Sequence, residues 1–254
     1  MKGLPIDSLV ITCEHGGNRI PAACRRLFRN QRALLESHRG YDAGALVMAR
    51  ALARAFAAPL VTSTTSRLVV DLNRSIGHPQ HFSATTRALP SSLRTKLVAR
   101  YYRPYRIEVE RLVRQSVAQG RKVIHISSHS FTPELDGNVR NADVGLLYDP
   151  ARQRESDLCA RWKASLAVLA PQIRVRRNYP YAGKGDGLTS ALRRSFPVRA
   201  YVGIELEVNQ KIVFEGGRRW TALRSALVES LQMCISPTFD ANRKRRVANT
   251  GDSQ

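Results

Sequence analysis

Two histidines of this 254-residue sequence each lie at the end of an apolar run typical of a buried β-strand. His15 closes the segment Leu9-Val-Ile-Thr-Cys-Glu-His15, and His129 closes Lys122-Val-Ile-His-Ile-Ser-Ser-His129. Ligands of open α/β sheets bind outside the carboxyl ends of the strands, so one cleft could gather both imidazoles. Two histidines and a carboxylate leave an open position on zinc. Water bound there becomes acidic and the ion polarises a carbonyl, so we predict a hydrolytic zinc site.

The sequence offers two carboxylates as candidates for the third, acidic ligand. Asp42 stands where a helix is expected to open, a position in which aspartate commonly caps the helix, and a cap can still bind a metal through its second oxygen. Glu14 is adjacent to His15, but on an extended chain its side chain points to the opposite face. We therefore prefer Asp42 and keep Glu14 as the alternative.

The other histidines are not expected to bind this ion. His125 lies four residues before His129 on the same strand face, roughly 13 Å away at about 3.3 Å per residue. It is therefore predicted to belong to the core. His38, His78 and His81 occur in polar loop sequences and are expected to be solvated.

Two further groups supply candidate catalytic residues. Glu205 and Glu207 share one face of a predicted strand, and a carboxylate held near a metal-bound water is the usual general base, so we predict Glu207 as the base with Glu205 supporting it. The alternative is a solvated strand face or ion pairs with arginines.

Arg67 and the pair Asn73-Arg74 bracket another apolar run. A guanidinium binds a carboxylate bidentately, and one near the metal could stabilise an oxyanion.

Stepwise alternation of apolar runs and helical patterns predicts the elements that position these residues. Strands are expected at 9–13, 60–63, 68–72, 122–128, 144–148, 173–176 and 201–208. Helices are expected at 42–56, 93–117 (interrupted near Pro104), 155–169 and 218–234. The glycine- and tyrosine-containing segment from Asn178 to Thr189 is expected to be a loop, either a mobile cover over the site or simply a connection. We predict one α/β domain at 1–240 and a disordered basic, polar tail at 241–254.

Composition bounds the function classes. The chain carries 41 Lys and Arg against 20 Asp and Glu, a net charge of +21, yet 43% of its residues are hydrophobic, as in ordinary globular proteins. No zinc finger or other nucleic-acid motif accompanies this charge, so no specific nucleic-acid partner is expected. There is no apolar run of about 18 residues and no signal sequence, so we expect a cytoplasmic protein that does not enter a membrane. The four cysteines, far apart, are expected to be free thiols.

A series of motifs, in order over about residues 9 to 232, resembles the N-formylglutamate amidohydrolase family. They are Cys13-Glu-His-Gly-Gly-Asn18, Tyr41-Asp42-x-Gly44, Ser66-Arg-Leu-Val-Val-Asp-Leu-Asn-Arg74, His125-Ile-Ser-Ser-His-Ser-Phe-Thr-Pro133, Arg177-Asn-Tyr-Pro-Tyr-x-Gly183, Asp186-Gly-Leu-Thr189 and Gly203-Ile-Glu-Leu-Glu-Val-Asn-Gln210. This family is similar in turn to the zinc carboxypeptidases and aspartoacylases. The resemblance implies their phosphorylase/hydrolase-like fold, a central mixed β-sheet flanked by helices, and a zinc ion held by two histidines and a carboxylate.

Carried over by position, the resemblance also implies roles for single residues. His15 and His129 match the metal histidines, whereas Asn18 stands where the carboxypeptidases have their acidic ligand, which is why Asp42 is considered. Arg67 resembles the carbonyl-polarising arginine and Glu207 the general base. The implied substrate-binding residues are Asn73 and Arg74, which match a carboxylate-holding pair, and Asn178, Tyr181 and Thr189 of the later motifs.

The expected reaction is zinc-dependent cleavage of the amide bond of an N-acyl amino acid, such as N-formylglutamate, a small-molecule substrate. One alternative is a related metallo-amidase or peptidase that acts on a peptide or a cell-wall fragment. The other is a basic nucleic-acid-binding protein without catalysis. The oligomeric state, the acyl group and the metal actually bound do not follow from the sequence.

Overall fold

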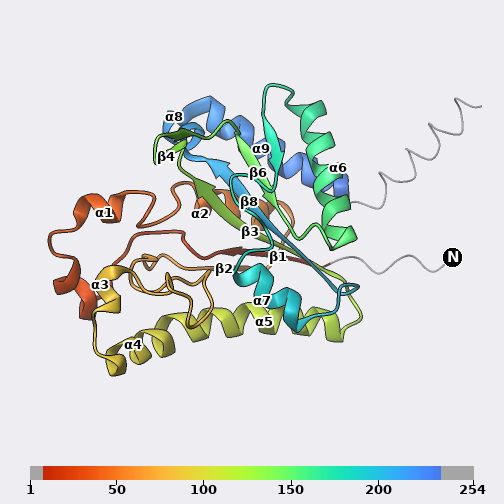
Figure 1. The fold of residues 1–254 in the computed structure, drawn as a ribbon. Helices are drawn as coiled ribbons and strands as arrows, with labels where there is room; N and C mark the ends of the chain where they lie inside the picture. The colour runs from red at the N-terminus through yellow and green to blue at the C-terminus, as the bar shows by residue number, and fades with distance from the viewer. Residues whose placement is uncertain (1–7, 236–254) are drawn as a thin grey trace, which may run out of the picture.

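A mixed β-sheet forms the centre of the computed structural model, which describes residues 8–235 (Figure 1). Six strands pair in the order β2-β1-β3-β8-β6-β7. Neighbours from β2 to β8 pair in parallel, β6 pairs antiparallel to β8, and β7 runs parallel to β6. The strands are β1 (Ser8–Cys13), β2 (Leu60–Thr62), β3 (Val123–Phe131), β6 (Val144–Leu147), β7 (Val175–Arg177) and β8 (Tyr201–Asn209), with β4 (Glu134–Leu135) and β5 (Asn138–Val139) as a separate hairpin. The predicted α/β domain with a central mixed sheet is confirmed.

Helices cover both faces of this sheet. In Figure 1, α6 and α9 lie on one side of the strands, and α5 and α7 lie on the other. The helices are α1 (Arg32–Glu36), α2 (Ala45–Ala55), α3 (Ala84–Arg87), α4 (Ser91–Leu97), α5 (Arg103–Ala118), α6 (Gln153–Leu169), α7 (Leu188–Ser195), α8 (Gln210–Glu215) and α9 (Gly217–Ile235), with a 3-10 helix η1 (Ala22–Phe28) and a π-helical segment η2 (Val98–Tyr102). None of these described helices is both long and apolar enough to cross a bilayer.

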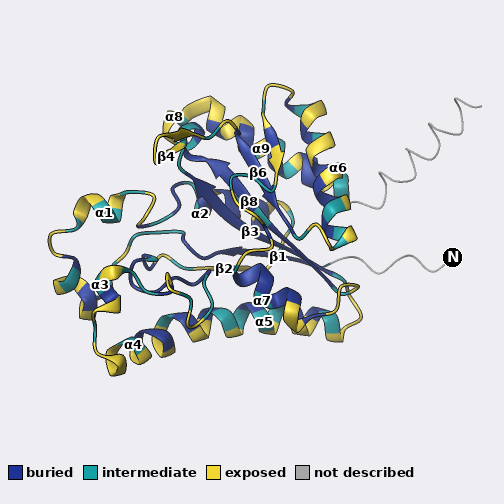
Figure 2. Ribbon diagram, in the orientation of Figure 1, coloured by how far each residue is buried: buried dark blue, intermediate teal, exposed yellow. Residues whose placement is uncertain are grey.

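The two faces of the sheet differ in polarity because side chains alternate along each strand. Ile126 on β3 and Ile204 and Leu206 on β8 face the core formed with α2, α6 and α9. The intervening residues of the same strands face α5 and α7. There, Val123 and Tyr201 at the start of β3 and β8 belong to the apolar core, and the positions that follow on this face carry polar side chains or glycine as far as Phe131. Figure 2 shows β3 and β8 buried along almost their whole length, so the polar part of this second face lies inside the protein.

The long predicted helix around Pro104 is continuous but irregular. The chain passes from α4 through η2 into α5, with Pro104 in the first turn of α5. Proline lacks an N–H group and its ring clashes with the carbonyl of the residue four positions before it. The wider turns of the π-helix just before Pro104 relieve that conflict, which explains the predicted interruption.

The predicted strand at 68–72 is wrong. This apolar run is buried against the α5 side of the sheet, but it forms successive turns and pairs with no strand. The Val69 amide donates to the Ser66 carbonyl, and the Asp71 amide donates to the His81 carbonyl. A short apolar run reports burial equally well for a strand and for an irregular buried segment, so its pattern could not separate the two.

Two histidines test the expectations for residues outside the metal site. His125 is fully buried, as predicted, between the Thr12 hydroxyl (2.9 Å from Nε2) and the Tyr201 hydroxyl (2.7 Å from Nδ1). Desolvation lowers the pKa of His125 to about 4.

His81, expected to be solvated, is instead 2% exposed and packs edge-on against Phe82 and Tyr102. The four cysteines are free, as predicted, and the predicted tail at 241–254 lies outside the described residues.

We predict that His125 makes the protein less stable in acid. Between pH 6.5 and about 4 the unfolded chain protonates this imidazole and the folded protein does not, so stability falls as the pH falls through this range. Between pH 7 and pH 5, the free energy of unfolding of the chelator-treated wild type should fall by about 2 kcal/mol more than that of His125→Gln. Urea unfolding at both pH values measures this difference. His78→Gln, a loop variant, should behave as the wild type, and equal losses in His125→Gln and the wild type would contradict the prediction.

Candidate active site

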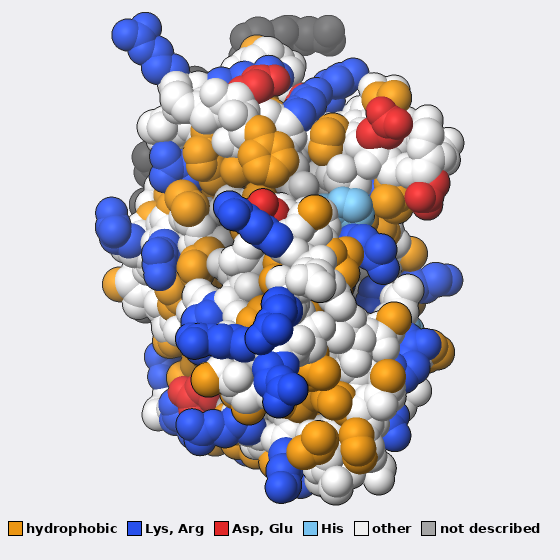
Figure 3. Space-filling view, turned by 90° about the vertical axis from the view of Figure 1, so that its left-hand side faces the viewer, with side chains coloured by type: hydrophobic (Ala, Val, Ile, Leu, Met, Phe, Trp, Pro, Cys, Tyr) orange, Lys and Arg blue, Asp and Glu red, His pale blue; other side chains and the backbone are white. Residues whose placement is uncertain are grey.

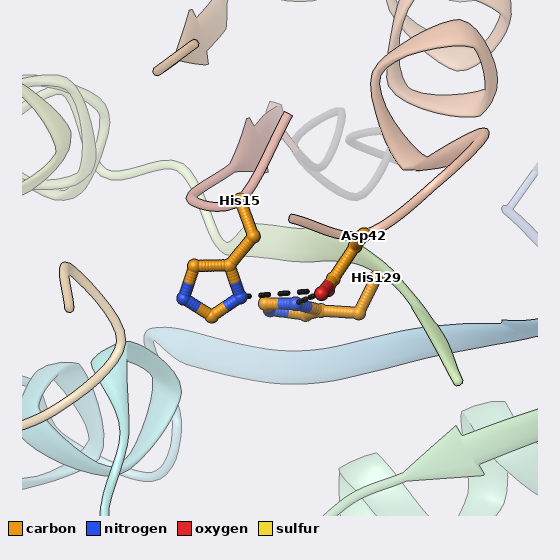
Figure 4. Close-up of side chains that lie close together, drawn as sticks. All are labelled: His15, Asp42 and His129. Atoms are coloured by element: carbon orange, nitrogen blue, oxygen red, sulfur yellow. Dashed lines mark hydrogen bonds and ion pairs between the residues drawn. The ribbon is translucent and has the colours of Figure 1, made fainter. Parts of the chain in front are cut away.

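His15, Asp42 and His129 form a buried cluster at the carboxyl end of the parallel strands (Figure 4). Asp42 Oδ2 lies 2.8 Å from His129 Nδ1 and 3.4 Å from His15 Nδ1. One ligand atom from each residue lies within 4.8 Å of the others, and the three residues are 1%, 4% and 3% exposed in chain order. The structure thus brings together the two histidines and the acidic residue that the sequence analysis preferred.

Local backbone contacts hold Asp42 in this position. Its amide donates to the His15 carbonyl (2.9 Å), which ties the segment before α2 to the loop after β1. Asp42 is not the helix cap that its position suggested. The helix begins later, after Gly44, whose φ of +80° and whose contact with Val213 exclude a side chain. The Asp42 carboxylate is therefore free to turn toward the histidines.

His129 comes from within a strand and not from the loop behind it. Strand β3 continues to Phe131, longer than predicted, and His129 pairs with Glu207 of β8. The two side chains share the α5 face of the sheet, on neighbouring strands about 4.8 Å apart. This pairing places Glu207 directly beside the cluster.

Each histidine is also held from behind by a buried carboxylate. His15 Nε2 lies 2.8 Å from Asp71 Oδ1. His129 Nε2 lies 2.9 Å from the Ser127 hydroxyl, which itself donates to Glu14, and 3.2 Å from Glu14 Oε2. A carboxylate that accepts the N–H of one ring nitrogen fixes the tautomer and directs the lone pair of the other nitrogen outward. When the rings are neutral, as a metal requires of its histidine ligands, both Nδ1 atoms present lone pairs to the cluster.

Glu14 therefore lies behind His129 and outside the ligand cluster. It is fully buried, and its carboxylate accepts hydrogen bonds from the Ser127 hydroxyl (2.7 Å) and the Tyr105 hydroxyl (3.1 Å). Burial by itself would raise the pKa of Glu14, but the hydrogen bond and charge of His129, together with Ser127, outweigh it and hold the pKa well below its usual range. The geometry favours Asp42, not the alternative Glu14, as the acidic ligand.

Arg67 joins the carboxylates of the site. Its Nε and Nη2 donate to Asp71 Oδ2 at 3.2 and 2.8 Å, and its Nη1 lies 3.4 Å from Asp42 Oδ1. The Arg67 side chain is 26% exposed, so part of it reaches the surface. The pKa of Asp71 is held well below its usual value because Arg67 and His15 outweigh the effect of burial.

Glu207 is the buried carboxylate without a fixed partner. Its Oε2 has no hydrogen-bond partner, and the side chain is 5% exposed. Desolvation, with smaller contributions from Asp42 and Glu205, raises the pKa of Glu207 to about 8. Glu205, predicted to support it, accepts a hydrogen bond from the Thr189 hydroxyl (2.6 Å). An unpartnered carboxylate beside a cluster of metal-binding groups is placed to exchange protons with a bound substrate or water.

The predicted substrate-binding residues lie in segments that join this site. Asn73 Oδ1 accepts from the Leu188 amide (2.7 Å), and Arg74 Nη1 donates to the Asp186 carbonyl (2.7 Å). Asn178 Oδ1 accepts from the amides of Tyr148 and Gly183, and Tyr181 accepts from Arg140. Thr189 is fully buried in α7, beyond the loop in which it was expected. These contacts organise the loop at 178–187, and the substrate-binding roles stay predictions.

No role behind the histidines is predicted from the sequence for Asp71, Glu14 or Tyr105. Asp71 lies four residues after Arg67, at the end of a buried apolar run, and this spacing was the available signal for it. Tyr105 reaches Glu14 from α5, and no local pattern indicates that contact.

Comparison with known proteins identifies the family and the fold. The sequence profile of the N-formylglutamate amidohydrolase family matches residues 7–214. A gene product of Agrobacterium tumefaciens of known structure is 28% identical, with 91% of each chain covered and a TM-score of 0.75. The N-formylglutamate amidohydrolase from Ralstonia eutropha JMP134 is 18% identical, with 92% of this chain and 94% of that chain covered and a TM-score of 0.64, and it shares the fold. No curated protein sequence matches significantly. Because the profile extends over most of the chain, this protein belongs to the N-formylglutamate amidohydrolase family.

Proposed function

We propose that this protein is a zinc-dependent amidohydrolase that cleaves the amide bond of an N-acyl amino acid, with N-formylglutamate as the expected substrate. The observation that carries the proposal is the convergence of His15 Nδ1, His129 Nδ1 and Asp42 Oδ2 beside the unpartnered carboxylate of Glu207. Family membership supports the amide-cleaving reaction.

The residues present fit a divalent cation. His15 Nδ1 is buried without a hydrogen-bond partner, so its lone pair has nothing to bind unless a cation lies in the cluster. With both imidazoles neutral, as metal ligands are, the carboxylates of Glu14, Asp42 and Asp71 form ion pairs with a single guanidinium among the described residues, that of Arg67. Two uncompensated negative charges remain in a buried region, and a divalent cation neutralises them.

His15, Asp42 and His129 would hold the zinc ion. When bound, zinc supplies Lewis-acid polarisation of the scissile carbonyl and lowers the pKa of the attacking water. Glu207 takes a proton from that water on its free Oε2 and then delivers it to the nitrogen of the departing amine. Burial raises the pKa of Glu207 to about 8. Because this pKa lies close to neutral pH, the carboxyl group can both accept and release a proton.

Three further residues bind and orient the substrate in this proposal. Arg67, whose side chain is partly exposed, directs its guanidinium at the oxygen that gains negative charge during attack. Asn73 and Arg74 anchor the α-carboxylate, so that binding energy at that group orients the amide bond toward Glu207. Arg74 Nε is buried without a partner, which leaves hydrogen-bonding capacity for such an anion.

Metal removal and metal affinity test the cluster. Chelation should abolish hydrolysis of N-formylglutamate, and added Zn²⁺ should restore it. Full activity of the metal-free protein would refute zinc dependence.

Glu14→Gln should weaken Zn²⁺ binding about 10- to 100-fold, because the carboxylate that orients His129 is lost while the three ligands remain. Competition with a chromophoric chelator measures the affinity. Asp186→Asn, whose carboxylate binds Ser75, is the control and should keep wild-type affinity.

Glu207→Gln separates proton transfer from metal binding. The amide cannot accept a proton, so kcat should fall by at least about 100-fold, while zinc content by metal analysis stays near one ion per chain. Glu205→Gln, which loses only the supporting carboxylate, should retain more activity. Turnover of Glu207→Gln at the wild-type rate would remove Glu207 as the base.

Arg74→Ala tests the carboxylate anchor. For N-formyl amino acids with a free α-carboxylate, KM should rise about 10-fold or more, because a charge-assisted hydrogen bond is lost. For the corresponding α-carboxamides, KM should change little. Steady-state formate release from both substrates gives the comparison, and an equal effect on both would dismiss the anchoring role.

A further inference from the structure

We propose that Arg140, stacked on Tyr181, is a specificity-determining residue that binds the side-chain carboxylate of an acidic N-acyl amino acid. The inference rests on the proposed function and adds to it a residue outside every motif discussed so far. Three observations carry it: the backbone position of Arg140, the loop that brings Tyr181 to it, and the charges around the mouth of the site.

The backbone of Arg140 is fixed at the carboxyl edge of the sheet. Its amide donates to the carbonyl of Pro133 (2.8 Å), just beyond the end of β3. Its carbonyl accepts from the side-chain amide of Asn209 (3.3 Å), at the end of β8 and two residues after Glu207. Arg140 is therefore anchored to the ends of the two strands that carry His129 and the proposed base.

The loop at 178–187 brings Tyr181 to the same edge. Gly145 of β6 pairs with Glu207, and a Cβ atom on Gly145 would lie 2.1 Å from the Tyr179 carbonyl oxygen and 3.1 Å from Glu207 Cβ. The loop thus passes directly over the strand position beside Glu207, which only glycine permits. Two residues further on, the Tyr181 hydroxyl accepts a hydrogen bond from Arg140 Nη1 (2.9 Å). The Arg140 guanidinium lies 5.0 Å from the centre of the Tyr181 ring.

Arg140 is a cation without an acidic partner among residues 8–235. Its side chain bonds only to the neutral hydroxyl of Tyr181, and its Nε and Nη2 have no hydrogen-bond partner in the part of the chain that the structure describes. Tyr181 holds the guanidinium plane by stacking and leaves that edge available. A guanidinium edge with two donors matches the two oxygens of a carboxylate.

The surrounding charges favour an anion at this mouth. Arg39, Arg67 and Arg140 lie around His38 and form what we call the cationic rim. Burial lowers the pKa of His38, and the three guanidinium groups, Arg140 first among them, lower it further. The acids of the site lie deeper and are buried. Figure 3, which views the side toward which β3 and β8 point, shows basic side chains far outnumbering acidic ones. A substrate with a second carboxylate is attracted electrostatically by the rim, whereas a substrate with a neutral side chain is not.

Kinetics on two nearly isosteric substrates test the proposal with the zinc-loaded, full-length protein. N-formylglutamate and N-formylglutamine share the amide bond and the α-carboxylate and differ in side-chain charge. Arg140→Gln should lower kcat/KM for N-formylglutamate about 10- to 100-fold and that for N-formylglutamine less than about threefold. Arg140→Lys, which keeps the charge without the paired donors, should show a smaller loss, again confined to N-formylglutamate.

A matched variant controls for disturbance of the loop. Arg176 stacks on Tyr179 of the same loop at 4.3 Å, and Arg176→Gln should leave both substrates unaffected. Equal losses on the two substrates in both Arg140 variants would show that Arg140 only holds the loop, and an unchanged preference would likewise overturn the proposal.

Calorimetric binding of glutarate and its monoamide, glutaramate, separates this proposal from the proposed function. Wild type should bind glutarate more tightly than glutaramate, and Arg140→Gln should remove the difference. If wild type hydrolyses no N-formyl amino acid but shows this Arg140-dependent preference, the subsite stands and the proposed reaction falls. If the preference is absent from the wild type or survives in Arg140→Gln, the subsite is refuted whatever the reaction.

Discussion

The site depends on the way two buried imidazoles are held at their far nitrogens. Asp71 and Glu14 bind the Nε2 atoms of His15 and His129, and this leaves both Nδ1 atoms directed at Asp42. Each carboxylate is itself buried and needs its own partners, which Arg67, Ser127 and Tyr105 supply. A buried charge without such partners would be costly, so the arrangement is stable only as a connected network.

The mixed sheet supplies the rigid frame for this network. Alternation of side chains places apolar residues of β3 and β8 against α2, α6 and α9, while the opposite face carries the polar residues. Because the same two strands contribute to both faces, the packed core on one side fixes the spacing of His129 and Glu207 on the other. Precise placement of catalytic groups on strands, rather than on loops, is what a preorganised site requires.

Charge is arranged in layers from the interior to the mouth. Carboxylates dominate the buried interior, where they contact the histidines, and the cationic rim lies outside them. Part of the net charge of +21 is gathered in this rim. Such a rim favours the approach of an anion.

The sequence by itself determined the mixed α/β fold and the two histidines of the cluster. Apolar runs ending in polar groups, and their order along the chain, indicated His15, His129 and Glu207, whereas the acidic residue stayed open between Asp42 and Glu14. Local patterns report burial and periodicity but not partners. They therefore mistook the buried turns at 68–72 for a strand and His81 for a solvated residue.

Only the tertiary structure decided which carboxylate binds which histidine and what faces the mouth. Asp71 meets His15 across 56 positions of sequence, and Glu14 meets His129 although it adjoins His15. Arg140 reaches Tyr181 across 41 positions, from a hairpin with no recognisable motif. Contacts between such distant segments arise from strand register and from the packing of α5 and the loops against the sheet, and neither is encoded in the spacing of neighbouring residues.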